Sequence, residues 1–209
     1  MAGALFVGLT TLDLIYLAEG PPIANQKKVA LDAIICTGGP ATNAAIAFAQ
    51  LGGSARLVSA VGQHPLTSVI HQELQTHSVI LQDLLDPEIA PEILPPVSSI
   101  VVSQATGERA VISLNATRSP KPAQQFSLEE LDAWLTRAEI VLLDGHQIAV
   151  GQAIAARAKQ QGIPVVLDGG SWKPGLEQVL PLVDYAICSA NFYPPTIPHS
   201  EINHSGVDH

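Results

Sequence analysis

Charged, aromatic and sulfur-containing residues are scarce in this sequence, and long apolar runs are absent. Of 209 residues, 14% are charged and 4% are aromatic, and 10 basic against 19 acidic side chains give a net charge of −9. So few basic groups leave no face to neutralise phosphates, which excludes non-specific binding to nucleic acid. No apolar stretch reaches the roughly 18 residues that a membrane span needs, so no membrane partner is expected. No basic segment precedes the first apolar run, so no secretory signal is expected.

Cysteine occurs only twice, at Cys36 and Cys188, far apart in the chain. Two such residues cannot form the disulfide framework of a small secreted protein, and we predict a cytoplasmic protein in a reducing environment. Both cysteines adjoin apolar runs, so we expect both to be buried as small apolar side chains.

Apolar residues, by contrast, make up 47% of the sequence. This fraction and the chain length predict one sizeable α/β domain with a large core, over residues 1–193. The composition turns polar at Pro194, and residues 194–209 are expected to form an exposed tail. His199, His204 and His209 recur every five residues in this tail, a spacing that does not align them on one helix face. We therefore interpret them as part of the tail, and no metal site is predicted.

Strands and helices alternate with short connections, which predicts a parallel sheet built from βαβ units with right-handed crossovers. Ser127 and Glu130 form a capping box, which predicts the start of a helix after Ser127. Apolar residues at helical spacing should give that helix a buried stripe: Leu128, Leu131, Trp134, Leu135 and Ala138. The expected strands of the main sheet span residues 4–8, 55–61, 140–143, 163–167 and 185–188, and the other expected helices span 40–51, 65–76, 147–161 and 175–180.

A second group of strands breaks this alternation and is assigned to a small separate sheet. The segments are residues 12–18, 29–35, 97–103 and 109–114. Ala105 to Glu108 is the expected hairpin turn between the last two of them. The small sheet should therefore lie within residues 12–35 and 97–114.

Two polar motifs near the N-terminus could carry chemistry. Gly38-Gly39-Pro40-Ala41-Thr42-Asn43 opens the first helix, where paired glycines let the backbone approach a ligand and free N–H groups are available. Asn43 on the first turn can donate and accept hydrogen bonds, which suits a polyhydroxylated ligand, although an ordinary glycine turn explains the same residues. Asp13 follows the first strand, where open α/β sheets bind ligands, and it fits either a hydroxyl-binding acceptor or a solvent-facing turn residue.

The order of these motifs resembles the sugar-binding half of PfkB-type (ribokinase-like) carbohydrate kinases. A strand ends in G-x-x-x-x-D at Asp13, and G-G-x-x-x-N opens a helix at Gly38 to Asn43. Residues 106–109 (T-G-E-R) resemble the tip of the family's lid hairpin. Other stretches with the same likeness are residues 58–62, 141–145, 165–170 and 171–184, the last closest to the ketohexokinase-like members.

The resemblance implies a Rossmann-type parallel-sheet sandwich with a small β-sheet lid, which often mediates dimerisation in this family. It implies that Asp13, Gly38, Gly39 and Asn43 contact a sugar, and that Arg109 belongs to the lid. It further implies that ATP, with Mg²⁺, donates a phosphoryl group to a sugar hydroxyl. A small-molecule sugar and a second copy paired through the lid are the expected partners.

The sequence departs from the family pattern in three places. Gln63, His64 and Thr67 stand where the family has an acidic pair and then a glycine. Residues 189–192 (S-A-N-F) stand where the family has N-x-x-E, which is linked to Mg²⁺ and phosphate. The D-T-x-G-A-G-D run, which supplies oxyanion-hole amides and the catalytic base, is absent from the 209 residues. We therefore expect the C-terminal third of the family fold and its base to be missing, with weak or no phosphoryl transfer by this chain.

Four further residues could line a site or serve the fold. Asp144 and Asp168 each end a predicted strand, and structural capping is favoured over polar lining for both. Trp172 and Lys173 follow on a loop, where they fit either site lining or packing.

The rival to the kinase hypothesis is a non-catalytic remnant that binds sugar or pairs subunits. Loss of the later strands would expose an apolar sheet edge and favour association between copies. A nucleotide-dependent oxidoreductase is a weaker third hypothesis, because no G-x-G-x-x-G follows the first strand.

Overall fold

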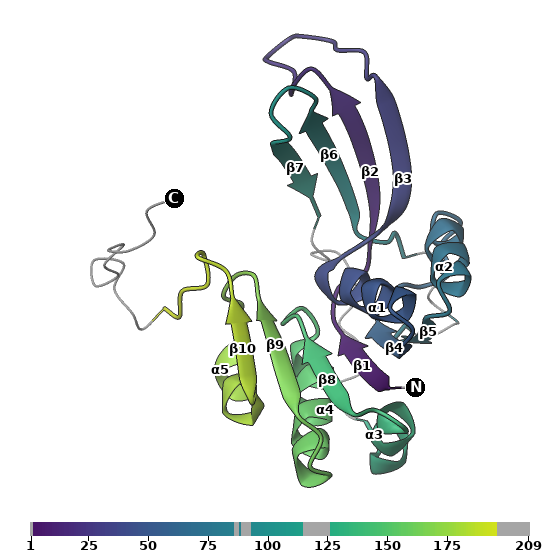
Figure 1. Ribbon diagram of the computed structural model, residues 1–209, viewed down its shortest axis with the longest axis vertical. Helices are drawn as coiled ribbons and strands as arrows, with labels where there is room; N and C mark the ends of the chain where they lie inside the picture. Colours follow the sequence, from purple (N-terminus) through teal and green to yellow (C-terminus); the bar gives the residue numbers. More distant parts are fainter. Residues whose placement is uncertain (1, 86–87, 89–92, 115–125, 196–209) are drawn as a thin grey trace.

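Two sheets make up the protein: a six-stranded sheet covered by helices and a separate four-stranded sheet (Figure 1). The computed structural model describes residues 2–85, 88, 93–114 and 126–195. The tail predicted over 194–209 lies, from residue 196 onward, outside the described residues. The predicted α/β class with a parallel main sheet and a small second sheet is confirmed.

The main sheet is parallel throughout, with the strand order β10-β9-β8-β1-β4-β5. All five residues of its central strand β1 are buried, as expected for a parallel strand covered on both faces. Sequence patterns missed β5, a short edge strand that carries two polar residues, Gln82 and Asp83. The strands are β1 (Gly3–Val7), β4 (Ser54–Ser59), β5 (Ile80–Asp83), β8 (Ile140–Leu143), β9 (Val165–Gly169) and β10 (Tyr185–Cys188).

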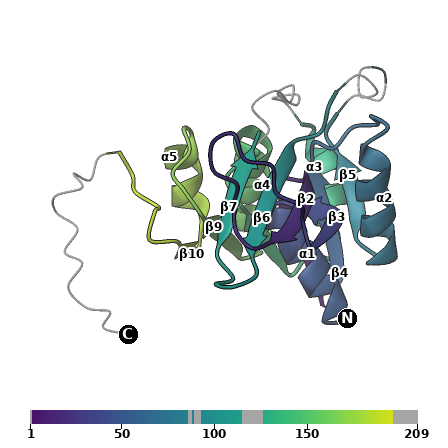
Figure 2. The same cartoon turned by 90° about the horizontal axis from the view of Figure 1, so that it is seen from above.

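Helices form a layer on each face of the main sheet (Figures 1 and 2). Because side chains alternate along a strand, Ala4 and Phe6 of β1 face one layer and Leu5 and Val7 face the other. The first layer consists of α1 (Pro40–Gln50) and α2 (Thr67–Thr76), and the second of α3 (Leu128–Leu135), α4 (Ile148–Gln160) and α5 (Leu176–Val179).

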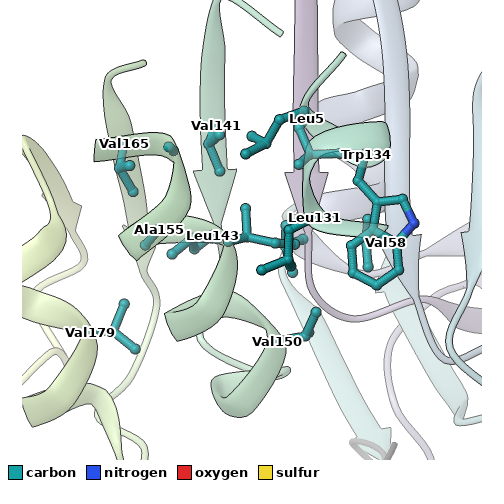
Figure 3. Packing of buried hydrophobic residues seen from close by; sticks show 14 of the residues in the cluster. Leu5, Val58, Leu131, Trp134, Val141, Leu143, Val150, Ala155, Val165 and Val179 are labelled. Atoms are coloured by element: carbon teal, nitrogen blue, oxygen red, sulfur yellow. The ribbon is translucent and has the colours of Figure 1, made fainter. Parts of the chain in front are cut away.

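The second layer shows how sequence pattern becomes packing (Figure 3). The predicted capping box is present: Ser127 Oγ accepts from the Glu130 amide, and the Glu130 carboxylate accepts from the Ser127 amide. Leu131 and Trp134 then reach the core beside Leu5. Leu128, predicted to be buried, is 64% exposed, because it occupies the first helical position, beyond the sheet-facing part of the stripe.

The four-stranded sheet, called the small sheet below, has the order β3-β2-β6-β7. It stands away from the main sheet (Figure 1). The two sheets meet where β2 begins and β3 ends. Its strands are β2 (Thr11–Ala18), β3 (Asp32–Gly38), β6 (Val97–Ser103) and β7 (Arg109–Ser113). The strand β3 was predicted over residues 29–35 and lies three positions later, because Gly38 still pairs with Thr11.

Two findings bear on what the composition suggested. Among the described residues, no helix is both long and apolar enough to cross a lipid bilayer. The prediction that both cysteines are buried is wrong: Cys36 is half-buried, and Cys188 is exposed at the edge strand β10. Its strand β10 has no neighbour beyond it in the described sheet, so the side chain remains in solvent.

Candidate functional site

The candidate site lies at the junction where β1 ends, α1 begins and the small sheet joins the main one. This junction is at the carboxyl end of the parallel strands, where open α/β sheets bind their ligands. Asp13 reaches it from β2, and Gly38 and Gly39 reach it from the end of β3. Three of the predicted site residues therefore meet at one place.

Asp13 and Gly38 are in direct apposition on neighbouring strands. A Cβ atom at Gly38 would lie 2.0 Å from Asp13 Oδ2, so only glycine leaves room for this carboxylate. Thr11 Oγ1 donates to Asp13 Oδ1 at 2.6 Å and orients the group. Cys36 lies opposite Asp13 on β3, and burial and then the charges of Glu73 and Asp13 raise the pKa of its thiol, which disfavours the thiolate.

Gly39 turns the chain from β3 into α1. Its φ of 102° lies in the region that side chains avoid, and a Cβ there would meet the Leu9 carbonyl at 2.1 Å. Pro40 then occupies the first turn of the helix, where its missing N–H costs nothing. The backbone at this turn is consequently fixed in shape, and it packs closely against the Leu9 carbonyl.

Asn43 and Arg109 occupy different positions relative to this turn. Asn43 lies on the first turn of α1, with its amide hydrogen-bonded to the Gly39 carbonyl and its side chain exposed. Arg109 lies at the far end of the small sheet, where it pairs with Val102, whereas Asp13 pairs with Ser98. Four ladder steps of about 3.3 Å each separate the two positions, so the structure does not bring Arg109 to the junction.

Asp144, which follows β8, joins the segment after β1 to the start of α1. Its Oδ2 accepts from the amides of Leu9 (2.8 Å) and Ala41 (3.1 Å), and its Oδ1 accepts from the amide (2.9 Å) and Nδ1 (3.1 Å) of His146. The side chain is fully buried. These contacts use the capacity of the carboxylate, so Asp144 acts as the structural cap that the sequence suggested.

A buried hydroxyl network lies beside this carboxylate, and sequence patterns did not reveal it. Thr10 Oγ1 contacts Thr42 Oγ1 and Ser59 Oγ, each at 2.8 Å, while Thr42 reaches the Leu9 carbonyl and Ser59 the Gly8 carbonyl. Three hydroxyl protons serve these four contacts, so the protons must be shared. The network ties the end of β1 to α1 and β4.

Asp168, the fourth residue of β9, differs from Asp144. Among the described residues its carboxylate accepts no hydrogen bond, and burial raises its pKa, as does the nearby Asp144 charge. Lys173 lies in the same region, where its Nζ donates to the carbonyls of Ser171 (3.2 Å) and, weakly, Asp144 (3.5 Å). Burial lowers the pKa of Lys173. Asp168 is thus polar lining rather than the expected cap.

The segment at the place of the family's N-x-x-E motif is closed by packing. Ser189 Oγ donates to the Gly170 carbonyl at 2.7 Å, and the rings of Phe192 and Trp172 lie 5.6 Å apart between centroids. Trp172 therefore packs, one of the two roles predicted for it. Across the described residues, no three His, Cys, Asp or Glu side chains are grouped to hold a metal ion.

The loop at the first departure from the family pattern is held by residues of its own. The Asp83 carboxylate accepts from the amides of Val61 and Gly62, and Thr67 Oγ1 and His71 Nε2 both contact the Gly62 carbonyl. Asp83 belongs to the strand that sequence patterns missed, which is why its role was missed too. This loop shapes the edge of the sheet beyond β4.

Solved structures share this architecture over most of the chain. A candidate ribokinase from Agrobacterium tumefaciens is 23% identical with a TM-score of 0.73, over 88% of this chain and 58% of that one. Ribokinase from Arabidopsis thaliana, in complex with ribose and ATP, is 21% identical with a TM-score of 0.67, over 89% and 60%. Ribokinase from Cryptococcus neoformans var. grubii, in complex with ADP, is 13% identical with a TM-score of 0.65, over 88% and 56%. At these identities the likeness shows the fold.

The lengths of these proteins differ from that of this chain, which spans only 56 to 60% of each of the three. The family match is more extensive: residues 1–191 match the pfkB family of carbohydrate kinases. That range contains the whole junction and both sheets. The chain therefore belongs to the pfkB family of carbohydrate kinases.

Proposed function

We propose that this chain supplies the acceptor side of an ATP-dependent carbohydrate kinase, with Asp13, Gly38, Gly39 and Asn43 binding the sugar. The observation that carries the proposal is the apposition of the Asp13 carboxylate and the Gly38 backbone beside the start of α1. An ionised carboxylate accepts from two hydroxyls, which matches a polyol, and the Gly38-Gly39 backbone lies directly beside it. Among the solved structures, the Arabidopsis ribokinase carries ribose and ATP. The ketohexokinase-like branch and a cytoplasmic location stay predictions.

The proposal that phosphoryl transfer is impaired is supported by the segment at residues 189–192. Phe192 packs on Trp172 where a carboxylate linked to Mg²⁺ would be needed, and no metal-binding group is present among the described residues. ATP with Mg²⁺ would provide the phosphoryl group, and the acceptor residues would position the sugar hydroxyl. We therefore expect this chain to bind sugar and to transfer phosphate weakly or not at all.

Asp13→Asn tests the acceptor site, with Asp32→Asn as its matched control. Both aspartates lie on the small sheet, but Asp32 is exposed at its far end and accepts only from the next residue, Ala33. Hydrogen bonds to a charged group contribute about 1.5–3 kcal/mol, so Asp13→Asn should weaken sugar binding by roughly 10- to 100-fold. Calorimetric titration over a panel of aldoses and ketoses measures this. Equal binding by wild type and Asp13→Asn would contradict the assignment of Asp13.

Phosphoryl transfer needs a separate assay, in which ADP release is coupled to a reporter over the same sugar panel. Turnover far above background would show that this chain completes a nucleotide site, and would overturn the expectation of weak activity. Background turnover together with sugar binding would support an acceptor-side module.

The second candidate function is subunit pairing through the small sheet, and it is favoured by the apolar character of both sheet faces. Ile34 and Ile35 are each 58% exposed, and as neighbours on one strand they point to opposite faces. Ile34 shares its face with Asp13, whereas Ile35 shares the other face with Ile112, which is 81% exposed. A ligand bound at the junction can cover only the face that carries Asp13 and Ile34. We propose that a second copy covers the other.

Ile35→Lys combined with Ile112→Lys tests the pairing, and Ile23→Lys is the control. Ile23 is 75% exposed but lies in the loop outside the small sheet. Light scattering across protein concentrations should show a dimer for wild type and the control, and a monomer for the double variant, because buried lysines oppose association. A wild-type monomer at high concentration would contradict the pairing.

A further inference from the structure

His146 is the one side chain at the junction whose role the capping and the proposed sugar contacts leave open. It follows Asp144 in the turn between β8 and α4, where Gly145 takes a φ of 75°. Its backbone amide already donates to Asp144 Oδ1 at 2.9 Å, which closes this turn. The ring adds a second contact to the same oxygen, Nδ1 to Oδ1 at 3.1 Å. Turn formation does not require that second contact.

The contact to Asp144 fixes the chemistry of the imidazole ring. A carboxylate only accepts hydrogen bonds, so Nδ1 must carry the proton, and in the neutral ring Nε2 keeps a free lone pair. The orienting carboxylate is fully buried, while the His146 side chain keeps 15% exposure. Among the described residues, no partner is recorded for Nε2. The ring is thus held through Nδ1, and Nε2 is left as a hydrogen-bond acceptor.

The same carboxylate places the ring beside the proposed sugar site. Asp144 Oδ1 holds His146, and Oδ2 holds the amide of Ala41, two residues after Gly39. The positive form of the ring also lowers the pKa of Asp168, so the two side chains lie within electrostatic reach of each other. One carboxylate therefore links His146 to the start of α1, and Asp168 of β9 lies within electrostatic reach of the ring.

We infer that His146 is a sugar-binding residue, whose Nε2 accepts a hydrogen bond from an acceptor hydroxyl while Asp144 fixes its tautomer and direction. This inference rests on the proposed function of the junction as the sugar site. An acceptor nitrogen at this position complements Asp13, which accepts hydrogen bonds from the small-sheet side. Hydroxyls on two sides of one sugar would then each donate a hydrogen bond to the protein. The ring discriminates sugars by the presence of a hydroxyl at the position it faces.

Two amide substitutions separate the roles of the two ring nitrogens. His146→Asn keeps a donor near the place of Nδ1 and removes Nε2, and His146→Gln places an amide near Nε2. His77→Asn is the matched control, because His77 also uses Nδ1 for one side-chain contact, to Gln50 at 2.7 Å, and lies at the end of α2. Loss of one neutral hydrogen bond, about 1 kcal/mol, predicts roughly five-fold weaker sugar binding for His146→Asn with an unchanged melting temperature. His146→Gln should recover part of the affinity.

The experiment titrates D-ribose, D-fructose and D-glucose into wild type and the three variants by calorimetry, and follows the histidine ring ¹⁵N resonances of wild type by NMR. We expect the Nε2 resonance of His146 to shift on addition of a sugar that binds, which does not depend on whether any variant folds. Binding by wild type with an unmoved Nε2 resonance, or with equal affinity in a folded His146→Asn, would overturn the inference and leave the proposed function standing. No binding of any of these sugars or of a wider aldose and ketose panel by wild type would instead overturn the proposed function, and this inference with it.

Discussion

Replacing Asp144 with alanine should destabilise the fold far more than its place in a loop after β8 suggests. The substitution removes the acceptor of two deeply buried amides, those of Leu9 and Ala41. An unpaired buried N–H costs about 1–3 kcal/mol, so the two together predict a loss of roughly 2–6 kcal/mol in the free energy of unfolding. Because a domain of this kind is stable by only about 5–15 kcal/mol, this single carboxylate decides whether the junction forms.

Urea unfolding followed by circular dichroism measures this loss, and Asp144→Asn separates hydrogen bonding from volume. The asparagine has the same size, but its NH₂ group must face an N–H donor, so it should also destabilise. Asp132→Ala is the control, because the exposed Asp132 carboxylate pairs with Arg157 on the surface, and its removal should change the midpoint little. A loss below about 1 kcal/mol for Asp144→Ala would refute the claim that its hydrogen bonds hold the junction.

Three further substitutions test separate parts of the structure. Gly38→Ala should abolish sugar binding measured by calorimetry, because its Cβ would lie 2.0 Å from Asp13 Oδ2 and displace that carboxylate; unchanged affinity would contradict the apposition. Asp168→Asn should raise the urea midpoint at neutral pH, because burial raises the pKa of Asp168 and the folded state is disfavoured once this group ionises. That gain should shrink as pH falls toward the usual carboxyl pKa of 3.8, and a gain that grows in acid would reverse the sign of the argument. Ser127→Ala should cost about 1 kcal/mol in thermal unfolding, since it removes the side-chain acceptor of the α3 capping box, and no cost would contradict the cap.

The parallel sheet was predictable because its strands are short apolar runs separated by amphipathic helices. The central strand β1 shows why: a strand buried on both faces leaves a continuous apolar run in the sequence. The edge strand β5 has no such run, because Gln82 and Asp83 lie where the helices cover the sheet incompletely. Cys188 failed as a buried residue for a related reason, since a strand that looks like core in sequence can still be the last one in its sheet. The local sequence pattern therefore identifies a strand, whereas the position of that strand in the sheet decides whether its side chains are buried.

The candidate site was predictable only in part. Asp13 and the Gly38-Gly39 pair stood out because an acidic residue after a strand and paired glycines before a helix are both visible as local patterns. Their apposition depends on the pairing of β2 with β3, which sets Thr11 opposite Gly38 and Asp13 opposite Cys36, two residues away on the same face. The resemblance assigned Arg109 to the lid and not to this group, and the pairing of β7 with β6 places it at the far end of the small sheet.

Asp144 and Asp168 look alike in sequence, and the structure gives them opposite roles. Each comes at the end of an apolar run and precedes a glycine, but Asp144 lies beside the end of β1, where it receives the Leu9 amide, while α1 offers that of Ala41. Asp168 belongs to β9, the next strand outward, and receives neither amide. Strand order, which no local pattern records, therefore separates the cap from the lining residue.

We expect the proposed sugar site to keep its shape whether or not a nucleotide is bound. The Asp144 carboxylate and the Thr10, Thr42 and Ser59 hydroxyls bond to β4, to α1 and to the segments that follow β1 and β8, all within the described residues. A site whose backbone is fixed in this way requires little ordering when a ligand binds. Sugar affinity should therefore be the same with and without ATP and Mg²⁺ in the calorimeter, and affinity that appears only when the nucleotide is present would show that the junction is not preformed.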